Sequence, residues 1–206
     1  MRNRRNWICT IFFLSFYVFL IDNCFGGGSA QIFAKFPNKY FIETGTFGGE
    51  GVIQALTSEK FQKIYSIELS EDFYLSAVNR FKDNPRVTIV YGDSGKVLPR
   101  VLSKIDAPAT FWLDGHYSHC DTARGEENTP LLKELEAIKQ HSINTHTILI
   151  DDIRCCNTED FDYLLLETLC EKLRDINPNY IIEKIDGTEF LQDILVAYLV
   201  GEESCE

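Results

Sequence analysis

The sequence has few basic residues, no C-x-x-C cysteine pair and no internal repeat. Its 206 residues include 20 lysines and arginines against 31 aspartates and glutamates, and after residue 30 the counts become 17 and 30, a formal charge of −13. A surface with this excess of carboxylates repels phosphates, which argues against nucleic acid as a partner. With 45% hydrophobic residues, the chain suits one domain with a sizeable core.

The sequence contains cysteines, but their spacing matches no paired-cysteine motif. The chain contains seven, five of them after residue 30, and Cys155 and Cys156 are adjacent. This neighbouring pair could be redox-active. Buried free thiols are the interpretation we favour, because an unpaired cysteine usually behaves as a small apolar residue.

A dinucleotide fingerprint is also missing where one would be expected. In residues 40–54 an apolar run ends at Glu43, turns through four glycines and starts a helix, which is how an open α/β sheet builds a nucleotide pocket. Counting a G-x-G-x-x-G motif from Gly45 puts Phe47 and Glu50 at the second and third glycine positions, and Glu50 would repel a pyrophosphate. The pattern therefore favours a cationic ligand without phosphates, such as S-adenosylmethionine (SAM). A turn that only links strand to helix is the alternative.

Two later acidic positions continue this pattern. Glu68 lies 25 residues after Glu43 at the end of the next apolar run, about where such folds hold a ribose diol. Asp93 and Ser94 follow a third apolar run, where they would meet an adenine edge. Each acid alone could be a helix cap or a surface group, whereas the ordered set of three is more specific.

These segments resemble the nucleotide half of the class I SAM-dependent methyltransferases. In that family the acid and glycines after strand one border the methionine part, the acid after strand two holds the ribose, and the acid after strand three faces the adenine. The resemblance implies SAM as cofactor and predicts a set of cofactor-binding residues: Glu43, Gly45, Thr46, Gly48, Glu68, Asp93, Ser94 and Asp114.

The hydrophobic pattern predicts an α/β fold, a Rossmann-like three-layer sandwich. Apolar runs predict seven strands, at 40–45, 63–69, 87–91, 109–114, 146–153, 180–185 and 193–200, and helical periodicity appears near 50–57, 71–82, 95–104, 129–140 and 159–176. Alternating strands and helices give a mostly parallel sheet. Only Asp186 to Gln192 separates the last two strands, so we expect an antiparallel hairpin there, as in the methyltransferase topology.

The N-terminus resembles an export signal. Arginines at positions 2, 4 and 5 precede an uncharged stretch from Trp7 to Ile21, and small residues follow at Gly28 and Ala30. We therefore expect residues 1–30 to be a signal peptide or a membrane anchor attached through residues 7–21, and residues 31–206 to be the methyltransferase-like domain. The protein would then be exported or membrane-anchored. A cytoplasmic location is the alternative, because SAM is a cytosolic cofactor.

Three aspartates follow the fourth and fifth predicted strands. Asp114 ends one, and Asp151 and Asp152 end the other, so parallel strands would bring them to one edge of the sheet. Carboxylates held together favour a hard divalent cation, most simply Mg²⁺. This arrangement resembles the metal-dependent macrocin-type O-methyltransferases, which implies that Asp114, Asp151 and Asp152 bind the metal. The alternative is that these side chains only tighten a turn or cap a helix.

His116 borders these aspartates and is our candidate general base, with Asp114 as its catalytic partner. It could equally be a hydrogen-bonding group or a metal ligand, and with His119 it admits a weaker zinc interpretation. Polar residues 117–130 predict a loop that covers a substrate. In that loop Arg124 could recognise an anionic group or simply be solvated.

Together these features predict SAM-dependent methyl transfer to a hydroxyl of a small molecule or sugar, assisted by a divalent metal. The chain lacks the long N-terminal helical extension of the macrocin-type enzymes, so their substrate class does not carry over. One alternative is an exported Rossmann-like module that binds a metal or sugar without catalysis. An NAD-dependent oxidoreductase is disfavoured by Phe47 and by the closing hairpin.

Overall fold

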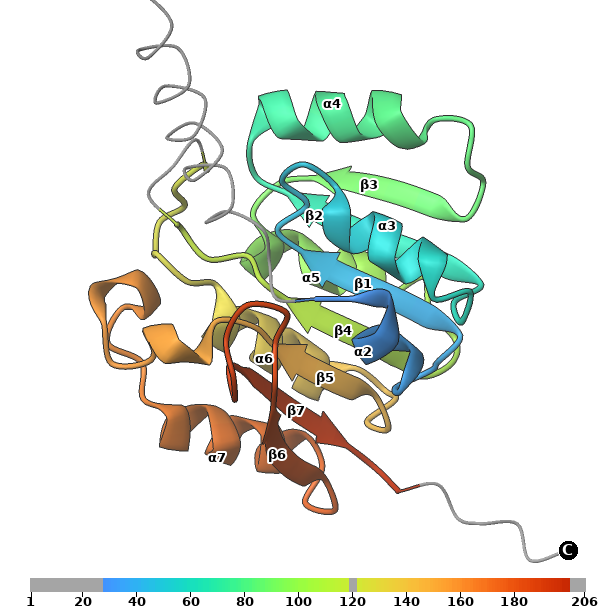
Figure 1. Ribbon diagram of the computed structural model, residues 1–206. Coiled ribbons are helices and arrows are strands. Elements are labelled where there is room, and N and C mark those ends of the chain that lie inside the picture. The colour runs from blue at the N-terminus through green and yellow to red at the C-terminus, as the bar shows by residue number, and fades with distance from the viewer. Residues whose placement is uncertain (1–27, 119–121, 201–206) are drawn as a thin grey trace, which may run out of the picture.

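The computed structural model describes residues 28–118 and 122–200, which form a seven-stranded sheet covered by helices on both faces (Figure 1). The strand order is β3-β2-β1-β4-β5-β7-β6. Strand β7 is antiparallel to both β5 and β6, whereas the β1–β2, β1–β4, β2–β3 and β4–β5 pairs are parallel. This confirms the expected mostly parallel sheet with its antiparallel C-terminal hairpin. The strands are β1 (Tyr40–Thr44), β2 (Lys63–Glu68), β3 (Val87–Tyr91), β4 (Ala109–Leu113), β5 (Thr147–Ile150), β6 (Ile181–Ile185) and β7 (Ile194–Tyr198).

Two hydrophobic clusters separate the layers. One packs Leu98, Leu135 and Leu169 from α5, α6 and α7 against one face of the sheet, and the other packs Phe33 and Val52 from α2 and α3 against the opposite face, together with α4. Every residue of the central strands β1 and β4 is buried, as expected of parallel strands covered on both sides. The helices are α2 (Ala30–Ala34), α3 (Glu50–Thr57), α4 (Glu71–Phe81), α5 (Ser94–Leu102), α6 (Leu131–Gln140) and α7 (Leu166–Ile176).

The helix expected over residues 159–176 is divided in the structure. A short 3-10 helix, η3 (Glu159–Phe161), is followed by Asp162 and Tyr163 with φ of 49° and 59°, and α7 begins only at Leu166. The Asp162 carboxylate accepts hydrogen bonds from the backbone nitrogens of Asn128 and Thr129, at 2.8 and 3.1 Å. These bonds to a distant loop hold a backbone conformation that a helix cannot contain.

The first described residues are part of the folded domain. Ser29 caps α2 by accepting from the Ile32 nitrogen at 3.3 Å, and Ile32 and Phe33 are buried. The predicted cleavage point after Ala30 thus lies at the first residue of α2. Residues 7–21, the apolar stretch of the predicted signal, lie outside the described residues. Within the described ranges, no helix is long and apolar enough to cross a membrane.

Candidate active site at the carboxyl edge of the sheet

Loops at the carboxyl ends of the parallel strands enclose a cleft with two adjoining cavities, which share Gly45, Phe47 and Asp114. The first, which we call the strand-end cavity, is lined by residues that include Glu68, Asp93, Ser94, Asp114, His116, Asp152 and Arg154. The second, the glycine-turn cavity, is lined by residues that include Ser29, Gln31, Glu43, Thr46, Gly48, Glu50 and Gln54. All the predicted cofactor-binding residues therefore line this one cleft.

The turn after β1 needs its glycine at position 45. Gly45 has a φ of +85°, and a Cβ there would collide with the backbone oxygen of Asp114, because the loops after β1 and β4 approach closely. Gly48 is different, since a side chain there would meet nothing within 4 Å and its φ is not positive. The space beside Gly48 is open for a ligand, but the backbone does not require glycine.

Glu43 is buried beneath this turn. It is 2% exposed, and its carboxyl accepts a hydrogen bond from the Ser66 hydroxyl. A Cβ at Gly51 would collide with the Glu43 Oε1 atom, so that glycine makes room for the acid. Burial raises the pKa of Glu43 to about 8, against a weaker opposing effect of Ser66. The carboxyl therefore holds a proton at neutral pH.

Glu68 joins the first two loops through backbone hydrogen bonds. One of its oxygens accepts from the Phe47 nitrogen at 2.8 Å and the other from the Ser70 nitrogen at 2.7 Å. The first bond helps hold Phe47 at a φ of 44°, and the Phe47 ring packs on Phe73 with centroids 4.5 Å apart. Each Glu68 oxygen keeps a lone pair for a further donor.

Asp93 serves as the cap of α5, accepting from the Gly95 nitrogen at 3.0 Å, and its other oxygen lies 3.4 Å from the Lys96 ammonium. It nevertheless lines the strand-end cavity beside Ser94. Asp93 can therefore both cap the helix and contact a ligand, because only one of its two carboxylate oxygens makes the cap.

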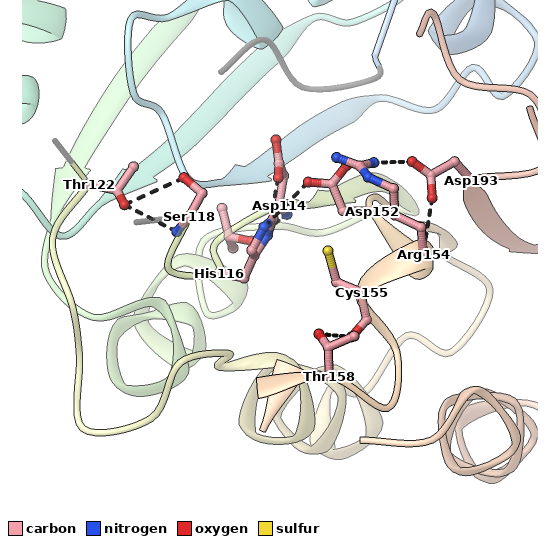
Figure 2. A network of polar contacts seen from close by, with 10 residues as sticks. Asp114, His116, Ser118, Thr122, Asp152, Arg154, Cys155, Thr158 and Asp193 are labelled. Carbon is pink, nitrogen blue, oxygen red and sulfur yellow. Dashed lines mark hydrogen bonds and ion pairs between the residues drawn. The ribbon is translucent and has the colours of Figure 1, made fainter. Parts of the chain in front are cut away.

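His116 lies between two carboxylates at the ends of β4 and β5 (Figure 2). Its Nδ1 is 3.6 Å from Asp114 Oδ1, and its Nε2 is 3.3 Å from Asp152 Oδ2. Burial lowers the pKa of His116, and Asp152 opposes this shift. Burial raises the pKa of Asp114 well above its usual range, helped by the nearby charges of Asp151, Asp152 and Glu43. The group combines a neutral imidazole with a carboxyl that resists ionisation.

The predicted metal ligands fall into two overlapping groups. Potential ligand atoms of Asp114, His116 and Asp152 all lie within 4.8 Å of one another, and so do those of Asp151, Asp152 and Asp193. The third potential ligand beside Asp114 and Asp152 is therefore His116, and not the predicted Asp151. Asp151 is 1% exposed and belongs with the second group, away from the cleft lining.

Arg154 and Asp193 complete this region and were not predicted from the sequence. Arg154 forms ion pairs with both Asp152 and Asp193 (Figure 2). Its guanidinium lies 4.1 Å from the ring centroid of Phe190. Asp152 adopts a left-handed backbone with a φ of 57°, and the neighbouring Ile153 nitrogen donates to Asp193 O at 3.0 Å. Contacts with the β6–β7 hairpin thus fix the orientation of Asp152, which no local sequence motif signals.

The remaining candidates of the sequence have smaller roles. Cys155 and Cys156 are free thiols, as predicted, but each is only partly buried. Burial still raises the pKa of each thiol to about 11, which makes both unreactive. Arg124 lies over the Tyr117 ring at 5.6 Å. His119 of the zinc interpretation, like Cys120 and Asp121, lies outside the described residues.

The sequence matches no known protein-family model and no curated protein sequence. The structure, in contrast, matches solved methyltransferases. The chain has their Rossmann-like fold. A protein described as an rRNA methylase from Clostridium thermocellum matches with a TM-score of 0.56 at 14% identity, over 82% of this chain and 92% of that one.

Two cofactor-bound structures show the same fold. The O-methyltransferase TomG from Streptomyces achromogenes, in complex with SAM, matches with a TM-score of 0.55 at 15% identity, over 84% of this chain and 78% of its own. The methyltransferase PaMTH1 from Podospora anserina, bound to S-adenosylhomocysteine (SAH), matches with a TM-score of 0.52 at 11% identity, over 79% and 72%. At these identities the likeness concerns the fold.

Proposed function

We propose that this chain binds SAM and transfers its methyl group to a hydroxyl of a small molecule. The observation that carries the proposal is the order of acids around one cleft: Glu43, Glu68 and Asp93 end three adjacent parallel strands and line two joined cavities. Glu43 would face the positive end of the cofactor, Glu68 the ribose, and Asp93 with Ser94 the adenine. The solved structures with this fold support SAM as the ligand.

His116 is the group that can accept the proton of the acceptor. Its pKa is lowered, so the imidazole is neutral at pH 7. In the transfer, the acceptor oxygen forms a bond to the methyl carbon as the carbon–sulfur bond breaks, the electron pair stays on sulfur to leave SAH, and the hydroxyl proton passes to His116. Asp114 and Asp152, at 3.6 and 3.3 Å, would stabilise the resulting imidazolium.

We extend this proposal to include a divalent metal, most simply Mg²⁺, that assists the transfer. The donor set of Asp114, His116 and Asp152 fits a divalent cation in charge, although an imidazole suits Mg²⁺ less well than a third oxygen would. A bound metal would lower the pKa of the acceptor hydroxyl. As a ligand His116 could not also be the base, so metal assistance and catalysis by His116 alone are separable.

Titration calorimetry with SAM, SAH and NAD tests the cofactor. We expect SAM and SAH to bind and NAD not to bind, and Glu68→Ala to weaken SAM binding by about 1–3 kcal/mol through the lost charged hydrogen bonds. Unchanged affinity in that variant would remove Glu68 from the site. Absence of SAM binding in the unaltered chain would favour the alternative of an exported module that binds a metal or sugar.

Turnover on a panel of hydroxylated small molecules tests the chemistry. We expect Asp114→Asn to lose activity while it still binds SAM, and Asp106→Asn, which alters an exposed ion pair with Lys39, to behave like the unaltered chain. Loss of activity in excess chelator, restored by Mg²⁺, is the outcome for metal assistance. Full turnover in excess chelator would refute it and leave His116 acting alone.

The cellular location of the protein is a separate proposal. We propose that residues 1–30 export the chain or anchor it to a membrane through residues 7–21, with the cytoplasm as the alternative.

A further inference from the structure

The glycine-turn cavity is acidic, yet one end of the proposed cofactor is an anion. Glu43, Glu50 and Asp114 line the cavity, and among its described lining residues none is a lysine or an arginine. The nearby Arg80 is outside this lining, and its Nη1 donates to the Gly48 carbonyl and pairs with Glu50 at 3.0 Å. The ammonium and sulfonium of SAM suit these acids. Its carboxylate needs neutral hydrogen-bond donors instead.

Two glutamine side chains line this cavity and can supply such donors. The Ala30 nitrogen donates to Gln54 Oε1 at 3.1 Å, which orients the Gln54 amide and leaves its Nε2 hydrogens for another acceptor. Gln31 comes from the facing segment and is exposed toward solvent. An amide donor with its acceptor end already occupied is suited to an anion.

The segment that carries Gln31 is firmly anchored. The Phe33 ring packs on Phe41 with centroids 4.7 Å apart and on Trp112 at 5.2 Å. At Gly28, a Cβ would lie 2.6 Å from the Phe33 ring, so the backbone there passes directly against the packed ring. Residues 28–31 are therefore a fixed wall of the cavity.

We propose that Gln31 and Gln54 bind the carboxylate of the cofactor's amino-acid end. The proposal rests on the proposed function, since it names residues for one part of the same ligand. It makes the segment before β1 a part of the cofactor site. It also distinguishes two ligands that differ in one group, because decarboxylated SAM keeps the cations and the adenosine but lacks the carboxylate.

Titration calorimetry of the full-length chain with SAM and with decarboxylated SAM tests this assignment. Gln31→Met removes one donor at nearly constant size. Gln54→Glu keeps an oxygen for the Ala30 nitrogen while placing a carboxylate where the amide nitrogen was. We expect each variant to bind SAM about tenfold more weakly or worse. Gln31→Met should bind decarboxylated SAM as the unaltered chain does, and Gln54→Glu, which adds a carboxylate beside the cations, should bind it at least as tightly. Gln62→Glu, at an exposed position outside the cavity lining, is the matched control and should change neither affinity.

An equal loss for both ligands would overturn the assignment, because a damaged fold or cavity weakens both. Unchanged SAM affinity in both variants would also overturn it, as would tighter binding of decarboxylated SAM by the unaltered chain. If the unaltered chain binds neither ligand, the proposed function itself fails, and this outcome is distinct from a failure of the assignment alone.

Discussion

Replacing Glu43 with glutamine should make the protein more stable and a poorer SAM binder. The carboxyl is buried, and its pKa is raised from an ordinary 4.5 to about 8. Between these values the unfolded chain carries the ionised carboxylate while the folded chain keeps the proton. The folded state therefore binds more protons, and its stability falls as the pH rises through this window.

The size of the effect follows from the width of the window. Each pKa unit corresponds to about 1.4 kcal/mol, so at pH 7 the raised pKa of Glu43 costs the fold roughly 3 kcal/mol. Glutamine has nearly the same shape and no charge to desolvate. Glu43→Gln should thus raise the free energy of unfolding by up to roughly 3 kcal/mol at pH 7 and by little at pH 5. For a chain of this size the gain corresponds to a higher melting temperature by roughly 6–12 °C at pH 7.

The same carboxyl should make cofactor binding depend on pH. A sulfonium and an ammonium favour the ionised form of Glu43, so SAM binding should release a proton and tighten as the pH rises toward 8. SAH lacks the sulfonium and should show a weaker dependence. In Glu43→Gln the affinity for SAM should fall and this contribution to the pH dependence should disappear.

Urea denaturation at pH 5 and pH 7, with calorimetric titration of SAM and SAH in two buffers of different ionisation enthalpy, measures both effects. Glu50→Gln is the control, because Glu50 lines the same cavity but its side chain is 42% exposed and paired with Arg80. That change should alter stability by much less. The reasoning is refuted if Glu43→Gln is no more stable than the unaltered chain at pH 7, or if its SAM affinity is unchanged.

Three further predictions concern other parts of the chain. Burial lowers the pKa of His146 from 6.5 to about 4, so the folded chain keeps this imidazole neutral. The free energy of unfolding should therefore fall by roughly 3 kcal/mol as the pH falls from 6.5 to 4. An NMR titration showing protonation of His146 near pH 6.5 would contradict this. Cys155 and Cys156 should react slowly with a thiol reagent at pH 7.5 and rapidly in denaturant, and fast native labelling would show them exposed. Fractionation with a C-terminal tag should find a product starting near Gln31, or a membrane-held precursor, outside the cytosol, whereas a soluble cytosolic full-length chain would disprove the export signal.

The carboxyl edge of the sheet could be predicted from the sequence because its information is local. Apolar runs locate the strands, and their alternation with helices makes the strands parallel, which brings their carboxyl ends to one edge. Glu43, Glu68, Asp93 and Asp114 line the same cleft for this reason. The break before α7 was missed because it depends on Asp162 bonding to Asn128, 34 residues away.

Local sequence does not predict which of Asp151 and Asp152 faces the cleft. The sequence pattern predicts both aspartates as metal ligands, but neighbouring residues leaving a strand point to opposite sides, and only Asp152 lines the cleft. Which one does so depends on the left-handed backbone of Asp152 and on Arg154, held in turn by Asp193 from the far hairpin. Such a contact between the β5 loop and the start of β7 has no sequence motif.

The two halves of the cleft are electrostatically linked through Glu43 and Asp114. Both pKa values are raised by burial, and the charge of Glu43 contributes to the raised pKa of Asp114. Two carboxyls so placed resist ionisation in the absence of a cation, and a sulfonium beside them would favour the ionised form of both. An ionised Asp114, with its oxygen 3.6 Å from His116 Nδ1, raises the proton affinity of that imidazole. In the proposed reaction the ionisation of Asp114 on SAM binding would thus offset the repulsion between the sulfonium and an imidazolium at His116.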